Sequence, residues 1–543
     1  MLRKPHQVIL VVSLALLALG GCSRPATPRQ EAPKGEGGQA GNVLRLVTEA
    51  PRSLDPLDAT SVYESISLNQ IFDGLVAFDP SMNVLPRLAS TWTISRDGRI
   101  YTLDLHEGVR FHDGTPLTAE DVVYTFRRLL SPASGRRNIA CSYLAVIEGA
   151  EQYLAGKTMD LPGVVATGPL TVKITLKRPY LSFLQVLALD GLKIVPKAVV
   201  ERVGQKAFSR APVGTGPFRL ESWKPERLRL VSNPGYFNGK ARLAGVEINF
   251  FDPGRDMDAA ERFDRREVDL IEVPTEHLDR LSKEPDVRIY RYQELNLAFL
   301  GLCSKLPPLD DARVRQAIAH AVSSEALADV FPGTRRAATG ILPPGLDGYS
   351  PQPKALQYDP DLSRKLLADA GYPGGRGLPV IDVYQGAGNV ASRRTSVRLQ
   401  SDLAAAGIRV NIREVPWSEL IWRVEELVAP AFLLGWVADL ADPDSFLRTM
   451  FETGGASNYF NYADPGTDRL LAEGAGETNP VARAAIYRHV EQRILEAAPI
   501  VPLYHPVGLL AARGYVRGLE PSPQGIGGAS FAGIWFSEEE PGR

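Results

Sequence analysis

Residues 108–122 read GVRFHDGTPLTAEDV, and this stretch does more than any other to decide the fold class. Asp113-Gly114 is a dipeptide typical of tight turns. Thr118 has the residue type of a helix cap, and Asp121, three residues later, completes a capping box. The stretch therefore predicts a turn followed by a helix over 118–130. His112 is interpreted as a turn residue and not as half of an acid–base pair with Asp113.

Strand and helix patterns alternate on both sides of this stretch. Alternating polar and apolar residues predict strands, and a proline directly after Asp or Asn predicts a helix start. A glycine turn at Gly98 joins two strands of a predicted hairpin. The expected strands are 43–47, 172–176, 380–383 and 408–412, and the expected helices are 359–371, 393–406 and 479–499. Residues 380–412 would form a βαβ-like unit, so the predicted class is α/β with several domains.

The length, charge and cysteine count of the chain exclude several classes of protein. The chain has 543 residues, with 61 Lys+Arg against 63 Asp+Glu and a formal net charge of −2. It is too long for one core at about 150 residues per domain. A nucleic-acid binder usually carries an excess of Lys and Arg, and this chain has none, so no nucleic-acid partner is expected. Three cysteines are too few for a disulfide scaffold. Cys141 and Cys303 are either buried thiols or a long-range disulfide.

The N-terminus reads as a targeting segment. Arg3 and Lys4 precede an apolar run over 8–19, which is shorter than the roughly twenty residues that span a bilayer. Residues 1–21 are therefore interpreted as a signal peptide. Leu19-Gly20-Gly21-Cys22 resembles the lipobox of bacterial lipoproteins, which implies a lipid on Cys22; the alternative is an ordinary secretory signal. Residues 22–41 carry no large apolar side chain and are expected to form a flexible tether.

Motifs for catalysis and cofactors are missing from the sequence. The seven histidines form no H-x-x-x-H pair and lie beside no paired cysteines. There is no G-x-S-x-G elbow and no Walker A loop, since residues 212–218 (PVGTGPF) lack the phosphate-binding Lys-Ser/Thr. We therefore expect no catalytic residue, no metal site, no cofactor and no enzyme activity.

Several strings in the chain resemble the signature of extracellular solute-binding protein family 5, the dipeptide- and oligopeptide-binding components of ABC importers. They occur in the family's order: the hairpin and helix strings at 92–122, PVGTGPF at 212–218, NPGYFNGK at 233–240 and GWVAD at 435–439. Residues 263–270 resemble a further family segment, F-x-x-G-E-x-D, but Arg266 stands where glycine is usual. Together the strings cover nearly all of the chain after the tether.

The resemblance implies a periplasmic-binding-protein clamshell, with two lobes joined by two crossing strands and an extra subdomain inserted in the first lobe. By the family pattern, lobe I comprises 42–71, 190–292 and 500–543, the inserted subdomain 72–189, and lobe II 293–499. Such proteins close on their ligand by hinge motion.

The resemblance also implies a set of ligand-binding residues. Asp439 would take the peptide ammonium, because a buried charge needs a partner; a turn cap is the alternative role, and Asp442 is a weaker candidate. The peptide backbone would pair as an added strand. Arg393 and Arg394 would bind the carboxylate, although both could equally be solvated helix charges. The strand-pairing residues are expected to be Gly435, Trp436 and Val437 on one side and Ser61, Val62 and Tyr63 on the other.

The resulting hypothesis is an extracytoplasmic, lipid-anchored and monomeric receptor that delivers short peptides to the permease of an ABC importer. Leu433 stands where some oligopeptide binders carry arginine, which favours short peptides. The alternatives are the same fold with another solute (a nickel chelate, an oligosaccharide or glutathione), a lipoprotein enzyme, or a sensor without transport.

Overall fold

The capped helix predicted from the opening stretch is α2, Ala119–Leu129. Thr118 caps it, and the Thr118 backbone N–H donates to Asp121 Oδ2 at 2.9 Å, so the capping box is confirmed. The computed structural model describes residues 42–59, 61–134, 138, 140–251, 259–351, 357–387, 390–455, 457–528 and 530–537. The predicted signal peptide, Cys22 and the tether lie outside the described residues.

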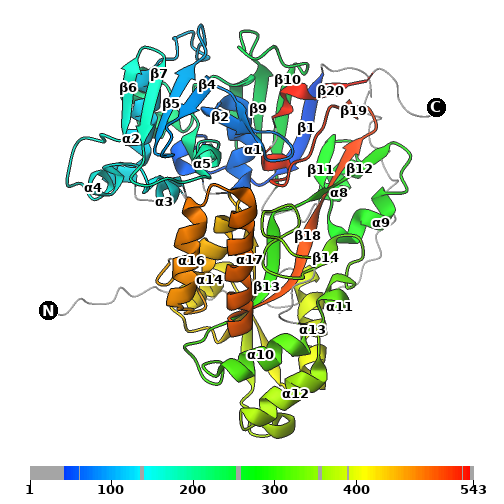
Figure 1. Cartoon of the computed structure of the whole chain (residues 1–543). Helices are drawn as coiled ribbons and strands as arrows, with labels where there is room; N and C mark the ends of the chain where they lie inside the picture. Colours follow the sequence, from blue (N-terminus) through cyan, green and yellow to red (C-terminus); the bar gives the residue numbers. More distant parts are fainter. Residues whose placement is uncertain are drawn as a thin grey trace, which may run out of the picture. The chain divides into compact units, whose positions relative to one another are not determined.

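A mixed sheet of twelve strands organises the described chain, which is α/β as predicted (Figure 1). Its main path runs β16-β15-β17-β13-β18-β11-β1-β10-β9-β8, and β12 and β14 pair with β18 beside that path. The strands are β1 Val43–Thr48, β8 Phe218–Lys224, β9 Arg227–Ser232, β10 Gly245–Phe250, β11 Leu270–Glu272, β12 Val287–Gln293, β13 Asn296–Leu302, β14 Arg335–Ala337, β15 Ile381–Gly386, β16 Val410–Val415, β17 Ala431–Val437 and β18 Ile500–Arg513.

A separate four-stranded sheet, in the order β4-β5-β7-β6, contains the predicted hairpin. Two strand pairs complete the β structure. The strands are β4 Ala89–Ile94, β5 Ile100–Leu105, β6 Val164–Gly168 and β7 Thr171–Thr175, with the pairs β2 Val76–Phe78 and β3 Val84–Pro86, and β19 Val516–Arg517 and β20 Trp535–Phe536.

Helices cover these sheets. The predicted helices after Asp359 and Asn479 are confirmed as α12 and α17, and both residues cap through their side chains. Besides α2, the α-helices of the described chain are α1 Val62–Ile71, α3 Ala140–Leu144, α4 Ala150–Leu154, α5 Phe183–Val186, α6 Lys197–Val203, α7 Gln205–Phe208, α8 Ala259–Asp264, α9 Leu278–Leu281, α10 Ala312–Ala321, α11 Ser324–Ala328, α12 Pro360–Asp369, α13 Val390–Ala405, α14 Trp417–Glu425, α15 Leu447–Phe451, α16 Pro465–Gly476 and α17 Pro480–Ala497.

The βαβ unit is confirmed, because β15 and β16 pair in parallel around α13. The strand predicted from Ile408 begins two residues later, at Val410. The Ile408 N–H donates to Leu403 O at 2.9 Å, and Gly407 has φ +88°. Ile408 therefore closes the end of α13 and is buried there before the strand starts.

One long strand, β18, links two parts of the large sheet: β16, β15, β17 and β13 on one side, and β11, β1, β10, β9 and β8 on the other. The first residues of β18 pair with β13, and the later ones pair with β12 and β11. Figure 1 shows β18 (orange-red) running from the level of β11 and β12 toward β13. The neighbouring segment β12–β13 makes the same passage, so two crossing strands connect the two parts. This arrangement is that of a two-lobed clamshell.

The buried side chains divide along the same lines. One core joins β1, β8, β9 and β10 with the C-terminal residues 510–534. A second core lies within the small sheet and α2. Further cores pack around β13, β15 and β17. Cys141 and Cys303 are both buried, and Cys141 Sγ donates to Leu129 O at 3.3 Å. Within the described residues, no helix is long and apolar enough to span a membrane.

Candidate functional site

A cavity of about 570 Å³ opens where residues from both parts of the large sheet meet. Its wall includes the start of α1, the end of β17 with the loop after it, and C-terminal residues between 523 and 528 together with Ser530. Five carboxylates and two cationic side chains line it: Asp73, Asp190, Glu272, Glu294 and Asp439, with Arg87 and Lys193. We call it the cleft cavity.

Asp439 lies in the wall of the cleft cavity, two residues after β17 ends. Its Oδ2 accepts a hydrogen bond from Tyr143 Oη at 3.2 Å, and its backbone carbonyl accepts one from Gln524 Nε2 at 3.4 Å. Burial raises the Asp439 pKa to about 6, and the Tyr143 hydrogen bond partly opposes that rise. Among the described residues no cation forms an ion pair with this carboxylate, which lies in the cavity wall.

Asp442, the second acidic residue of this loop, has a structural role. It is buried and forms an ion pair with Arg483 at 2.9 Å. Its Oδ2 also accepts a hydrogen bond from Ser182 Oγ. The carboxylate is therefore occupied, and Asp439 is the one that faces the cavity.

The last residues of β17 leave one backbone edge open. The Ala438 N–H donates to Leu295 O at 2.8 Å, and the β13–β17 register continues with Leu297 opposite Trp436. Because hydrogen-bonded pairs alternate in an antiparallel ladder, the backbone groups of Gly435 and Val437 point away from β13. On that far side, β15 pairs only with Ala431 and Phe432 in the described chain. Gly435 and Val437 thus present unpaired strand groups.

Trp436 and Val437 line the cleft cavity, and Gly435 is exposed beside them. Trp436 Nε1 donates to Ser445 O at 2.7 Å, which fixes the indole in the wall. The predicted edge residues of β17 therefore lie together with Asp439, at one side of the cavity.

The opposite predicted edge differs from expectation. Val62 and Tyr63 form the first turn of α1, so they offer no extended strand edge to a ligand. Ser61 caps this helix with φ −145° and ψ 162°, and Ser61 and Val62 line the cavity while Tyr63 does not. The later residues Ile66, Leu68 and Ile71 of this helix are buried in the core.

The two arginines expected to bind a carboxylate are not in the wall of the cleft cavity. Arg393 is exposed on α13, and its Nε lies 2.8 Å from Glu414 Oε1 on β16. Arg394 lies over the ring of Phe331, 5.4 Å from the ring centroid. The structure places both on α13 as surface charges with local contacts, which corresponds to the alternative interpretation of these residues.

Sequence reasoning missed the other charged residues of the cavity. Glu272 ends β11 and Glu294 follows β12. Along the sequence, Arg87 precedes the first strand of the four-stranded sheet, β4, and Lys193 follows its last strand, β7. No local motif marks these residues or the remaining two, Asp73 and Asp190, because segments distant in the sequence bring all six together.

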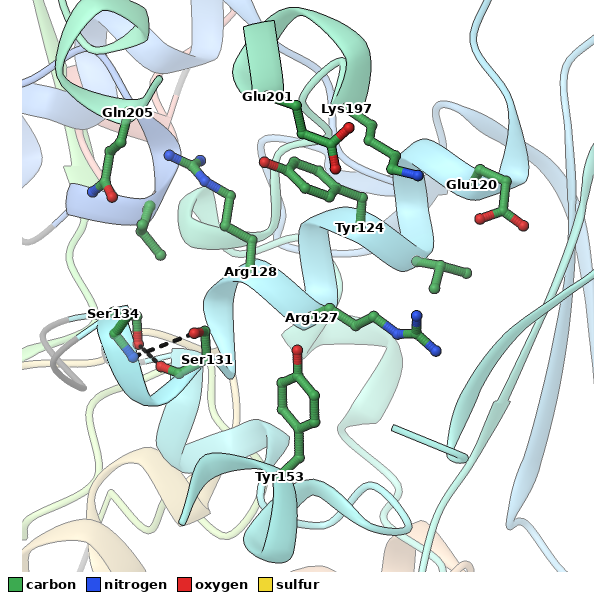
Figure 2. Close-up of a pocket in the computed structure, with 13 residues that line it drawn as sticks. Glu120, Tyr124, Arg127, Arg128, Ser131, Ser134, Tyr153, Lys197, Glu201 and Gln205 are labelled. Atoms are coloured by element: carbon green, nitrogen blue, oxygen red, sulfur yellow. Dashed lines mark hydrogen bonds between the residues drawn. The ribbon is translucent and has the colours of Figure 1, made fainter. Parts of the chain in front are cut away.

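A second cavity, of about 410 Å³, lies along α2 and α6. Figure 2 shows the residues that line this cavity, among them Arg127 and Arg128 of α2 together with Tyr124, Lys197 and Glu201. Arg128 Nη1 donates to Asp55 Oδ1 at 2.7 Å, and Arg127 pairs with Asp160 at 2.9 Å. Its arginines are thus occupied within the chain, and the cleft cavity is the better candidate for a ligand site.

Comparison with known proteins gives consistent matches. Residues 83–458 match the family model "Bacterial extracellular solute-binding proteins, family 5 Middle". The chain is 31% identical over 514 residues to the probable di/tripeptide-binding protein 5 of Pseudomonas aeruginosa, covering 90% of this chain and 94% of that protein. It is 29% identical over 549 residues to heme-binding protein A of Haemophilus influenzae, covering 95% and 97%.

A solved structure extends the comparison to three dimensions. The dipeptide-binding protein from Pseudoalteromonas sp. SM9913, in complex with Met-Leu, matches with a TM-score of 0.74 and 27% sequence identity. The match covers 91% of this chain and 100% of that one. The similarity therefore extends over the parts of the fold that build the cleft cavity.

Proposed function

We propose a function from the premise that the chain belongs to the bacterial extracellular solute-binding proteins, family 5. It captures short peptides in the cleft cavity, outside the cytoplasm, and delivers them to the permease of an ABC importer. It acts as a monomeric binding protein and not as an enzyme.

The observation that carries the proposal is the Asp439 carboxylate, which has no cationic partner in the described chain and follows directly on an open strand edge. A peptide ammonium would neutralise that carboxylate, which burial disfavours as a charged group. The peptide backbone would pair with the outward groups of Gly435 and Val437, as peptides do when they add a strand to a sheet edge. Main-chain pairing gives affinity for many sequences.

Two of the relatives favour short peptides. The Pseudomonas protein is named for di- and tripeptides, and the Pseudoalteromonas structure contains Met-Leu. A cavity of about 570 Å³ has the volume of a small-molecule site. The Haemophilus relative is named for heme, so heme is the competing ligand that the binding experiment must include.

Closure would come from the two crossing strands. We assign lobe I to 42–71, 190–292 and 500–543, the inserted subdomain to 72–189, and lobe II to 293–499. Ligand between the lobes would stabilise the closed form, which the permease recognises. The hydrogen bond from Tyr143 of the insert to Asp439 of lobe II supports a site that depends on both parts.

The anchor is a separate part of the proposal. A lipid on Cys22, after removal of residues 1–21, would hold the protein at the membrane surface, and residues 22–41 would act as the tether. Cys22→Ala should move the protein from the membrane fraction to the soluble fraction, with peptide affinity unchanged. Membrane association that persists in this variant would overturn the anchor.

Isothermal titration calorimetry of the purified protein tests the receptor function. We expect saturable binding of di- or tripeptides, and no displacement of a bound dipeptide by hemin or glutathione at equal concentration. Binding of hemin or glutathione without binding of any peptide would overturn the proposal. Peptidase assays on the same samples should give intact peptide.

A further inference from the structure

The cleft cavity has an excess of negative charge that the chain does not neutralise. Arg87 Nε lies 3.7 Å from Asp73 Oδ1, and Lys193 Nζ lies 3.7 Å from Asp190 Oδ1, so the two cations in the wall are each paired. Three of the five carboxylates, Asp439, Glu272 and Glu294, have no ion pair among the described residues. In the proposed function a peptide ammonium takes Asp439. Two carboxylates then remain for another part of the ligand.

Glu272 and Glu294 come from the two sides of β18, line the same cavity and are close enough for their charges to interact. Glu272 pairs with Leu510 of β18, and Tyr292, two residues before Glu294, pairs with Gly508. The walls of the cavity partly desolvate the Glu272 carboxylate and so raise its pKa, and the charge of Glu294 raises it further. Glu294 Oε2 accepts one hydrogen bond, from Asn296 Nδ2 at 3.1 Å. Such a pair is stabilised by a cation placed between or beside its members.

Tyr292 adds an aromatic face to this pair. Its ring packs directly on Gly508, where an added Cβ would come within 2.0 Å of the ring. A Cβ added at Gly525 would lie 3.0 Å from Tyr292 Oη and 3.8 Å from Glu272 Oε1. Gly508 therefore lets the Tyr292 ring pack closely on β18. Gly525 lets Tyr292 Oη and the Glu272 carboxylate approach the loop at 523–525. We call Glu272, Tyr292 and Glu294 the acidic end of the cleft cavity.

All three residues of the acidic end line the cavity, and Glu272 is solvent-accessible there. Two carboxylates beside an aromatic ring match the chemistry of an ammonium or guanidinium group, which takes charge-assisted hydrogen bonds and stacks on aromatic faces. We propose that the acidic end binds the cationic side chain of a lysine or arginine in the peptide, so that the receptor prefers basic peptides. This inference rests on the proposed peptide-receptor function.

Titration calorimetry with a matched peptide panel tests the preference. The panel is trialanine and the tripeptides in which lysine, glutamate or norleucine replaces each alanine in turn. Norleucine keeps an aliphatic chain of similar length without the charge, so it separates charge from packing. At least one lysine peptide should bind about tenfold or more tightly than its norleucine counterpart, and the glutamate peptides should bind most weakly.

The double variant Glu272→Gln/Glu294→Gln assigns the preference to these residues. It should abolish the gap between lysine and norleucine peptides while trialanine affinity stays within about twofold. Glu473→Gln, at an exposed position on α16, is the control and should keep the gap. Circular dichroism and melting temperature check that the double variant is folded.

The outcomes separate the two proposals. If trialanine binds but lysine and norleucine peptides bind alike, or if the double variant keeps the lysine preference, the acidic end is overturned and the receptor function stands. If no peptide in the panel binds, the receptor function fails and this inference fails with it.

Discussion

Replacing Asp439 by asparagine removes the charge of the proposed ammonium anchor and little else. Asparagine keeps the shape of the side chain, and its Oδ1 can still accept the hydrogen bond that Tyr143 Oη donates at 3.2 Å. Leaving a desolvated charge without its partner costs about 2–5 kcal/mol. The dissociation constant of a dipeptide should therefore rise about 30-fold to a few thousand-fold.

The assay pairs this variant with a change in the ligand. Calorimetry compares Ala-Leu with propionyl-Leu, which lacks only the ammonium group. In the wild-type protein the deletion should cost about 2 kcal/mol or more, and in Asp439→Asn it should cost little, because the two changes remove the same interaction. An equal cost of the ligand change in both proteins would refute the role of Asp439 as the anchor.

Stability serves as the control in this experiment. Because burial raises the Asp439 pKa from its ordinary value of 3.8 to about 6, the ionised carboxylate destabilises the ligand-free fold at pH 7. Asp439→Asn should then raise the free energy of unfolding of the ligand-free protein, by about 1–3 kcal/mol. Weaker binding with unchanged or higher stability separates loss of the anchor from loss of the fold.

Peptide affinity should fall about tenfold between pH 7 and pH 5, because the Asp439 pKa of about 6 means that the acceptor carboxylate is protonated at the lower pH; calorimetry across this range checks it, and a flat profile would contradict it. Tyr143→Phe removes the hydrogen bond that lowers the Asp439 pKa, so the midpoint of that profile should move upward by up to about one pH unit; a downward shift would contradict the assignment. Gly301→Ala should lower the free energy of unfolding by about 1–3 kcal/mol in a urea titration, since the added Cβ would lie 2.3 Å from the ring of Phe432. Its matched control is Gly476→Ala, where a Cβ meets open space, and equal effects of the two substitutions would contradict the packing argument.

Much of the fold could be predicted because its signals are local. Thr118 with Asp121, Asp359 with Pro360 and Asn479 with Pro480 each fix a helix start within a few residues, and all three starts are found. Ile408 shows where local reading ends. It has the residue type of a strand, but its N–H donates to Leu403 O, so it closes the end of a helix and is buried there.

The site was less accessible to sequence reasoning. Asp439, Trp436 and Val437 share one short motif and were found together in the cavity wall. Glu272 ends β11 and Glu294 follows β12, and both strands pair with β18. No spacing in the sequence could therefore predict that these two carboxylates line one cavity. Arg393 forms an ion pair with Glu414 on β16, and the residue pattern of a helix could not predict that contact either.

Native mass spectrometry of the protein purified from the cells that produce it tests the central claim most directly. We expect a non-covalent adduct that fragments into the backbone ions of a short peptide and that is lost in Asp439→Asn. An adduct that is a sugar, a metal chelate or heme, retained in the same variant, would contradict the account of the cleft cavity as a peptide site.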